Sequence, residues 1–440
     1  MKIIEGFEKA KAVLSRQAAV EYSISPSLKK RLKAMFGTES PEQAVRQIID
    51  EVRQRGDAAL FDYTKKIDGI ELKSLEISRQ QVKKAYSEVD AELVSALKLA
   101  AERIRRFHLR QKEGICKGFT DGIVGQIVRP LERVGVYVPG GTASYPSTVL
   151  MTAVPARVAG VKEVILTTPP RSNGTVPPLT LVAADIAGVD HIFSVGGAQA
   201  IAALAFGTKS IPKVDKVCGP GNIFVMLAKK LVYGVVDIDG LQGPSEVLII
   251  ADESANPAYC AADLLAQAEH DPLASAVLVT NSRRLADEVN REVEKQLKTL
   301  PRHTVVAESL ASNGVMAVVS TLDEAIELAN LYAPEHLALM VKNAGAYLER
   351  LTHAGCICVG EETTVVLGDY VAGPSHALPT GGTARFSSPL SVADFIKLTN
   401  FIAVDKASLK ELGAAARALA TAEGLEAHAR AVEKRLENSA

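Results

Sequence analysis

Short apolar runs alternate with amphipathic stretches along most of this chain. From residue 133 onward, β-branched runs end in glycine or proline and are followed by segments with a helical spacing of apolar residues. The first series of runs comprises 134–138, 163–168, 191–195, 216–218 and 235–239, and the second comprises 246–251, 276–280, 315–319, 336–341 and 356–360. Strands that alternate with helices are typical of parallel α/β sheets. The pattern predicts two similar α/β units that meet near Gly243-Pro244-Ser245.

The two ends of the chain have a different pattern. Residues 41–55 (with Ser40 as the N-cap), 78–86 and 91–109 have the periodicity of helices with charged outer faces. Residues 391–440 are rich in Ala, Leu, Lys and Glu and also have a helical pattern. Because this last segment is too short to bury a large core of its own, we expect it to dock on another surface.

Composition excludes several classes of protein. The chain has 440 residues, 47% of them apolar, and a formal net charge of -1 from 50 basic and 51 acidic side chains. The chain lacks the excess of basic residues that would favour binding to nucleic acid or to a membrane surface. The N-terminus is charged too early for a secretory signal, and no apolar run approaches the roughly 18 residues of a membrane span. We therefore expect a cytoplasmic protein.

The five cysteines fit that expectation, because an odd number in a long chain suggests reduced thiols. Cys356 and Cys358 lie in a predicted strand, where alternation points both thiols to one face. No second cysteine pair completes a zinc site, so we interpret both as small core residues.

The segment 263–272 carries the first candidate site. Asn256 is a predicted N-cap, and Asp271-Pro272 ends the helix. Gln267 and His270 are three residues apart, so their side chains lie on one face and can converge on a metal ion. Taken alone, the segment fits a histidine that caps the helix C-terminus at least as well.

Three further segments carry candidate chemistry. Glu335 and His336 are adjacent where a predicted helix meets a strand, which suits proton transfer in two separate steps; a solvent-exposed pair is the alternative. Asp369 lies in a predicted loop, 368–376, and is either a hard oxygen ligand or a turn residue. His428 lies on or beside the apolar stripe of the last helix, which residues 423–428 open, and a histidine there is usually part of the core. His376 stays undecided, whereas His108, His191, His303 and His353 are interpreted as structural.

Glycine-rich turns follow several strands of the first series. They are Pro139-Gly140-Gly141, Gly196-Gly197-Ala198-Gln199 and Gly219-Pro220-Gly221-Asn222. Such turns expose backbone N–H groups at helix N-termini and suit phosphate binding. None fits the Gly-x-Gly-x-x-Gly fingerprint, so ordinary strand–helix connections explain them equally well.

In their order along the chain, these segments resemble the histidinol dehydrogenase family. The matching motifs run from about 120 to 432 and include Val-Gly-Val-Tyr-Val-Pro-Gly-Gly, Gly-Pro-Ser-Glu-Val, Leu-Ala-Gln-Ala-Glu-His, Ala-Pro-Glu-His-Leu, Gly-Asp-Tyr and Glu-Gly-Leu-x-Ala-His. The resemblance implies two incomplete Rossmann-like domains of the aldehyde-dehydrogenase type, with helical N-terminal and C-terminal segments. We accordingly expect an N-terminal helical segment over 1–32, a first α/β domain from 33–135 plus 245–390 with the metal and acid–base residues, a second from 136–244 with the NAD contacts, and a dimerisation arm over 391–440.

The resemblance also implies a site. Its zinc ligands are Gln267, His270, Asp369 and His428, with one zinc per subunit. Its acid–base residues are Glu335 and His336, and its NAD contacts are Tyr137, Gln199 and Asn222. Around the substrate it places Ser245, His336, Glu423 and the metal ligands. In this family the terminal segments intertwine two subunits, which implies a homodimer that shares its active sites.

The implied reaction is the oxidation of histidinol to histidine through histidinal, the last steps of histidine biosynthesis. Four electrons leave the substrate, so two NAD⁺ are needed. His336 would act as the base for the alcohol, and Glu335 would activate water for the aldehyde. Two alternatives stay open: a homologous zinc and NAD dehydrogenase for another polar alcohol, and a silent metal-binding scaffold. Glu423 argues against the first, and the retained pair of Glu335 and His336 argues against the second.

Overall fold

The computed structural model describes residues 1–16, 25–140 and 144–437. The chain divides into two compact units. The core unit comprises Met1–Lys112 and Leu131–Phe395, and the tail unit comprises Glu113–Pro130 and Ile396–Ala440. None of the described helices is long and apolar enough to cross a membrane. Each unit is described by itself below.

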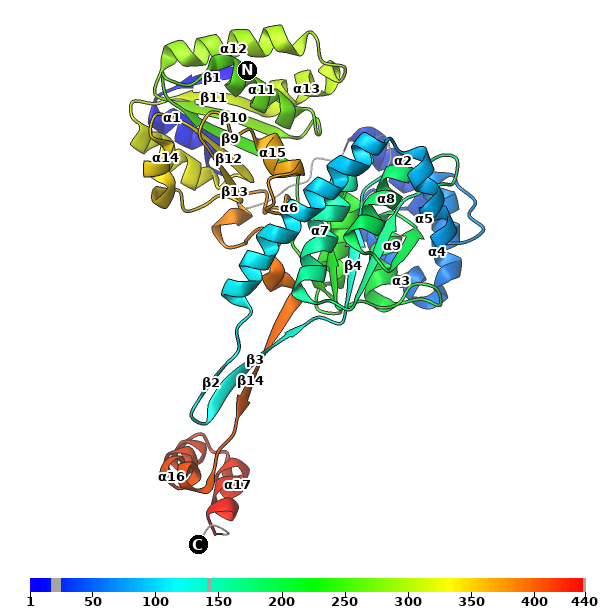
Figure 1. Cartoon of the computed structure of the whole chain (residues 1–440), viewed down its shortest axis with the longest axis vertical. Coiled ribbons are helices and arrows are strands. Elements are labelled where there is room, and N and C mark those ends of the chain that lie inside the picture. Colours follow the sequence, from blue (N-terminus) through cyan, green and yellow to red (C-terminus); the bar gives the residue numbers. More distant parts are fainter. Residues whose placement is uncertain (17–24, 141–143, 438–440) are drawn as a thin grey trace. The chain divides into compact units, whose positions relative to one another are not determined.

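The core unit contains a parallel sheet of six strands in the order β1-β11-β10-β9-β12-β13 (Figure 1). Its strands are β1 (Lys2–Glu5), β9 (Glu246–Ala251), β10 (Ser275–Thr280), β11 (Gly314–Val318), β12 (His336–Met340) and β13 (Cys356–Val359). Its helices are α1 (Phe7–Leu14), α11 (Pro257–Ala268), α12 (Arg283–Leu297), α13 (His303–Asn313), α14 (Leu322–Tyr332) and α15 (Val365–Tyr370). Alternate residues of β9 enter opposite layers: Val247 and Ile249 pack with α11 to α13, whereas Leu248 and Ile250 pack with α1 and α14.

A second parallel sheet has five strands in the order β6-β5-β4-β7-β8. Its strands are β4 (Arg133–Tyr137), β5 (Glu163–Thr168), β6 (His191–Ser194), β7 (Lys216–Cys218) and β8 (Asp237–Ile238). The helices between them are α7 (Pro146–Ala159), α8 (Pro178–Ala187), α9 (Gly197–Phe206) and α10 (Ile223–Val232). The earlier helices are α2 (Pro26–Phe36), α3 (Pro41–Arg55), α4 (Asp57–Tyr63), α5 (Arg79–Ala85) and α6 (Ala91–Ile115). The two expected series of parallel strands are thereby confirmed.

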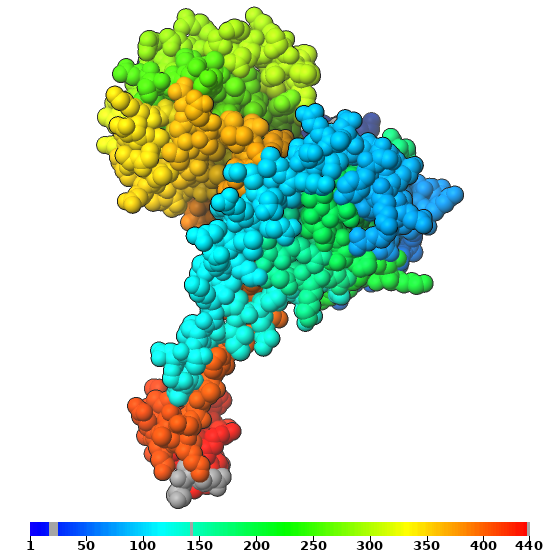
Figure 2. Space-filling model, in the orientation of Figure 1, coloured from blue at the N-terminus to red at the C-terminus, as the bar shows by residue number. Residues whose placement is uncertain are grey.

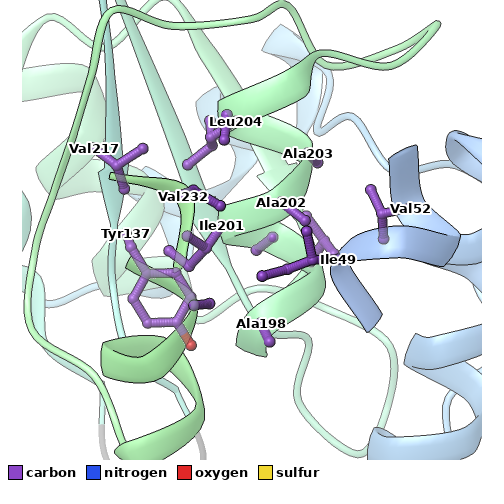
Figure 3. Packing of buried hydrophobic residues seen from close by; sticks show 14 of the residues in the cluster. Ile49, Val52, Tyr137, Ala198, Ile201, Ala202, Ala203, Leu204, Val217 and Val232 are labelled. Carbon is purple, nitrogen blue, oxygen red and sulfur yellow. The ribbon is translucent and has the colours of Figure 1, made fainter. Parts of the chain in front are cut away.

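Helix α3 corrects one expected domain boundary. It packs against α9 and α10, and Figure 3 shows Ile49 and Val52 facing Ala202 and Ala203 of α9. Residues 41–55 therefore cover the five-stranded sheet and, contrary to the expectation from the sequence, do not belong with 245–390. The alanine-rich face of α9 leaves room for the larger side chains of α3, and this complementarity is not visible in either helix alone.

The N-terminus also differs from the expected helical segment. Residues Lys2–Glu5 form strand β1, which pairs in parallel with β11 at the edge of the six-stranded sheet. Its four residues are too few to show the alternation that identifies a strand. The chain start therefore belongs to the layer that carries the acid–base residues.

The tail unit combines a small sheet with two helices. Strand β3 (Val124–Pro130) lies between β2 (Phe119–Asp121) and β14 (Ile396–Ile402), and both pairings are antiparallel. Helices α16 (Lys406–Ala422) and α17 (Glu426–Glu437) contact each other, in orange and red in Figure 2. A Cβ atom at Gly413 would lie 3.1 Å from Leu436, so glycine permits this close crossing. Of the expected helical arm over 391–440, the residues up to Phe395 belong to the core unit, and the part in the tail unit begins with strand β14.

Candidate active site

Glu335 and His336 lie at the amino edge of the six-stranded sheet. Helix α14 is followed by its C-cap residue Ala333, whose positive φ of 50° turns the chain toward the sheet, and His336 is the first residue of β12. The Glu335 carboxylate accepts a hydrogen bond of 2.8 Å from the backbone N–H of Glu246. His336 Nε2 lies 3.5 Å from Asp369 Oδ1. The two adjacent side chains thus have different partners, as separate roles require.

Burial shifts both groups away from their charged forms. Glu335 is buried, and burial together with the charges of Glu246 and Asp369 raises the pKa of its carboxyl well above the usual range, although the N–H of Glu246 acts against this. For His336, burial and the neighbouring His376 and His270 lower the pKa to about 3. The imidazole is therefore neutral near pH 7. Strongly shifted groups of this kind are typical of catalytic sites.

Helix α11 presents two of the expected ligands. The Asn256 side chain accepts from the N–H of Ala258 at 2.9 Å and caps the helix, as the sequence predicts. Gln267 is buried in the last turn, but the helix ends at Ala268, so His270 lies beyond it rather than within it. The N–H of His270 donates to the Gln267 carbonyl at 3.3 Å, which keeps the two residues together. His270 is exposed as a residue, but partial desolvation of its ring lowers its pKa and favours the neutral form that binds metals.

Asp369 lies in helix α15, not in a loop as expected. The Thr364 side chain caps this helix, and its hydroxyl donates to Asp263 Oδ1 at 2.5 Å. Asp263 is buried one helical turn before Gln267, so α15 is anchored to the face of α11 that carries Gln267. Sequence reasoning missed Asp263, although its spacing of four residues from Gln267 was the available signal.

His376, which the sequence left undecided, belongs to this cluster. Its Nδ1 lies 2.8 Å from the carbonyl oxygen of Asp369, and its Nε2 lies 3.4 Å from the Thr148 hydroxyl in α7. Burial lowers its pKa to about 4. His376 therefore supports the backbone at Asp369 as a neutral ring.

Among the described residues, no group of three or more His, Cys, Asp or Glu side chains is arranged to hold a metal ion. Of the four expected ligands, Gln267 is an amide and His428 belongs to the tail unit, so only His270 and Asp369 are of these types in the core unit. Burial and the Asp263 carboxylate raise the pKa of Asp369 to about 7. A divalent cation would relieve this cost, so the oxygen and nitrogen donors of the core unit fit a metal.

The expected NAD contacts lie at the carboxyl edge of the five-stranded sheet. Tyr137 ends β4, and its hydroxyl accepts from the N–H of Gly197 at 3.1 Å, at the start of α9. Gln199 is buried, and neither polar atom of its amide has a hydrogen-bond partner in the part of the chain that the structure describes. Asn222 follows β7 and caps α10. Unsatisfied buried amide atoms beside two helix N-termini fit a dinucleotide.

The remaining expected residues divide between the units. Ser245 directly precedes β9 in the core unit, and its carbonyl accepts from the N–H of Ser275 at 2.9 Å. Glu423 and His428 are exposed in the tail unit, where both line a hollow between α16 and α17. Glu423 is the C-cap of α16 and, contrary to the prediction from the sequence, does not open the last helix, because α17 begins at Glu426. The structure thus groups Ser245 with Glu335 through the adjacent Glu246.

Comparison with known proteins identifies the family. The family model described as histidinol dehydrogenase matches residues 33–436. The chain belongs to the histidinol dehydrogenase family. A histidinol dehydrogenase of Dehalococcoides mccartyi strain CBDB1 is 58% identical over 437 residues, which cover 99% of this chain and 100% of that relative. One of Moorella thermoacetica is 53% identical and covers 92% of this chain and 96% of its own.

A solved structure agrees with the fold. The crystal structure of histidinol dehydrogenase from Elizabethkingia anophelis superposes with a TM-score of 0.90 at 36% sequence identity, and covers 100% of this chain and 98% of that one. The resemblance read from the motifs is therefore confirmed, and with it the α/β fold. Histidinol dehydrogenases are oxidoreductases that act on CH–OH groups, and this chain is an enzyme of that class.

Proposed function

We propose that this chain oxidises L-histidinol to L-histidine through histidinal, with two NAD⁺ and one zinc ion per subunit, in histidine biosynthesis. The observation that carries the proposal is the pair of Glu335 and His336 with separate partners, in a chain that matches the family over residues 33–436. Gln267, His270 and Asp369 would hold the zinc together with His428, and Tyr137, Gln199 and Asn222 would contact NAD⁺. Bound zinc would orient the substrate.

His336 would take the hydroxyl proton of the alcohol as hydride leaves its carbon. Because the pKa of His336 is about 3, its ring is neutral near pH 7, and one nitrogen of a neutral ring carries the lone pair that accepts the proton.

Glu335 would take a proton from the water that adds to the aldehyde. Only its ionised carboxylate can do so, and the N–H of Glu246 stabilises that form at Oε2. A buried site also keeps the aldehyde from bulk solvent, so that both oxidations proceed on one bound molecule. Ser245 lies next to Glu246 and would contact the substrate.

The stoichiometry of the reaction tests the proposal. Two NADH formed per histidinol, abolished by a chelator and restored by zinc, is the expected result. One NADH per histidinol would contradict the role of Glu335. Turnover of another polar alcohol, but not of histidinol, would indicate a homologous dehydrogenase, and no NADH with any alcohol would indicate a scaffold. A cytoplasmic location is part of the proposal and is supported by the absence of disulfides among the five cysteines.

We also propose a homodimer in which the Glu423 and His428 that complete each site come from the partner's tail unit. The tail unit exposes many large apolar side chains for its size, which supports a covered surface: Leu398, Ile402, Leu412, Leu419 and Leu425 are all more than 40% exposed. The proposal predicts complementation between two inactive variants, His336→Ala and His428→Ala. In a mixed dimer with exchanged tails, one site carries both lesions and the other carries none, so activity should return partly. Mixed dimers without activity would contradict the exchange.

A further inference from the structure

Arg16 makes an unusually complete set of contacts in the core unit. Its two terminal nitrogens donate to Glu246 Oε1 and Oε2 at 2.6 and 2.8 Å, and its Nε donates to the carbonyl of Tyr332 at 2.8 Å. The guanidinium also lies 4.0 Å from the centroid of the Tyr332 ring. Only arginine combines a planar fork for a carboxylate with stacking on an aromatic face.

Both partners of Arg16 flank Glu335. Tyr332 ends α14, three residues before Glu335, and its hydroxyl donates to Ser275 at 2.7 Å. Glu246 begins β9, and its backbone N–H donates to Glu335 Oε2. Arg16 therefore joins the two segments between which the Glu335 carboxylate is held.

The positive charge of Arg16 balances the negative charge of the Glu246 carboxylate. The Glu246 side chain is 8% exposed, so its carboxylate needs a compensating cation. Arg16 supplies one, and the N–H of Gly381 adds a hydrogen bond of 3.2 Å to Glu246 Oε1. Without Arg16, Glu246 would be a buried, uncompensated charge beside Glu335, and each carboxylate would disfavour the ionised form of the other.

We propose that Arg16 is a positioning residue for the oxidation of the aldehyde: through Glu246 and Tyr332 it holds Glu335 in place and keeps it able to act as a base. The inference rests on the proposed function of Glu335. It adds a residue that precedes the segment 33–436 matched by the family model and that no motif in the sequence indicated.

The positioning role of Arg16 is tested by measuring how variants of Arg16 and of a control residue oxidise histidinal and histidinol. Arg16→Met should lower the turnover of histidinal about tenfold, as expected for a carboxylate that loses roughly one pKa unit of stabilisation. The first NADH formed from histidinol in a single turnover should change less than twofold, because the side-chain partner of His336 is Asp369, which Arg16 does not bind. Lys11→Met is the control, since Lys11 is an N-terminal cation that pairs with Glu327 on the exposed side of α14. It should leave both steps unchanged.

A double variant separates positioning from general loss of structure. In Arg16→Met with Glu246→Gln, both charges are gone, so turnover of histidinal should recover several-fold relative to Arg16→Met alone. Arg16→Lys keeps the charge but loses the fork and the stacking, and should fall between wild type and Arg16→Met. If Arg16→Met does not fold, the test uses Arg16→Lys and the double variant, with thermal unfolding as the check on each.

The outcomes distinguish this inference from the proposed function. Equal losses in both steps, or no loss in either, would overturn the role of Arg16 while Glu335→Gln still lost the aldehyde step. If Glu335→Gln itself oxidised histidinal normally, the base assignment would fail, and the role of Arg16 with it. A selective loss in Arg16→Met that the double variant partly restores would support both.

Discussion

The two parallel sheets of the core unit carry their candidate residues at opposite edges. In the five-stranded sheet, Tyr137 ends β4, and Gln199 and Asn222 follow β6 and β7, so all three lie at the carboxyl edge. In the six-stranded sheet, Ser245 and Glu335 directly precede β9 and β12, at the amino edge. Open α/β sheets generally bind ligands at the carboxyl edge. The first sheet follows this rule, and the second departs from it.

The helix ends at each edge explain what each can bind. At the carboxyl edge, α9 and α10 begin, and the positive partial charge of their N-termini suits a phosphate group. At the amino edge, α11 and α14 end, and the negative partial charge of their C-termini suits a cation. The Tyr332 carbonyl at the end of α14 already accepts from the Arg16 guanidinium. Two sheets of one architecture are therefore suited to ligands of opposite charge.

Proton chemistry divides in the same way. Burial raises the pKa of Tyr137 to about 12, so this hydroxyl stays neutral, and Gln199 does not titrate. At the amino edge, by contrast, Glu335, His336 and Asp369 all have shifted pKa values. This difference supports the proposal that the carboxyl edge binds NAD⁺ by neutral hydrogen bonds and that the amino edge transfers protons.

The largest effect should come from Glu335→Gln. Loss of a general base typically costs about 10²–10⁴-fold in rate, and here only the oxidation of histidinal should suffer it. His336→Ala should instead slow the first hydride transfer from histidinol. Single-turnover assays with each substrate measure the two steps separately. Equal losses on both substrates for both variants would argue against divided roles.

Removal of one ligand should be almost as severe. His270→Ala should bind zinc at least about a hundredfold more weakly, since even residues that only support a ligand are worth about 10–100-fold. Metal content after dialysis measures this, with His303→Ala as the control because His303 is exposed at the start of α13. The NAD⁺ affinity of the metal-free variant should stay normal if the two edges act independently. Full zinc retention with full activity would remove His270 from the ligand set.

A smaller effect is expected at the carboxyl edge. Gln199→Ala removes an amide that would make about one net hydrogen bond to NAD⁺, so KM for NAD⁺ should rise about tenfold. Zinc content and KM for histidinol should not change. A loss of zinc in this variant would show that the two edges are coupled rather than separate.

The smallest effect concerns a histidine outside both sites. His108 is fully buried in α6, and burial lowers its pKa below the value of about 6.5 in an unfolded chain. The unfolded state then binds more protons, so the free energy of unfolding falls as pH drops below 6.5. His108→Gln should reduce this acid sensitivity, by about 1.4 kcal/mol per pH unit at most, in urea titrations at pH 7 and 5.5. Both catalytic steps at pH 7.5 should remain normal, which would show that a lowered histidine pKa alone does not mark a site.

Local chemistry in the sequence determined the elements and the candidate residues. The Asn256 cap, the strand at 246–251 and the adjacency of Glu335 and His336 are encoded in a few consecutive residues, and the structure confirms the cap and the strand. Helix α15 could not be predicted from the sequence because it has only six residues, Val365–Tyr370. A segment that short shows no periodicity, and its cap depends on Asp263 about a hundred residues earlier.

The sequence by itself determined which residues have the right chemistry, because side-chain type, turn residues and apolar spacing are local properties. Only the tertiary structure decided which of them meet. Arg16 and Glu246 are 230 residues apart, and their pairing depends on β1 joining the edge of the sheet beside β11. Asp263 and Thr364 come together in the same way, across 101 residues. Contacts between distant segments follow from how helices and strands pack, and no local pattern records which faces will be complementary.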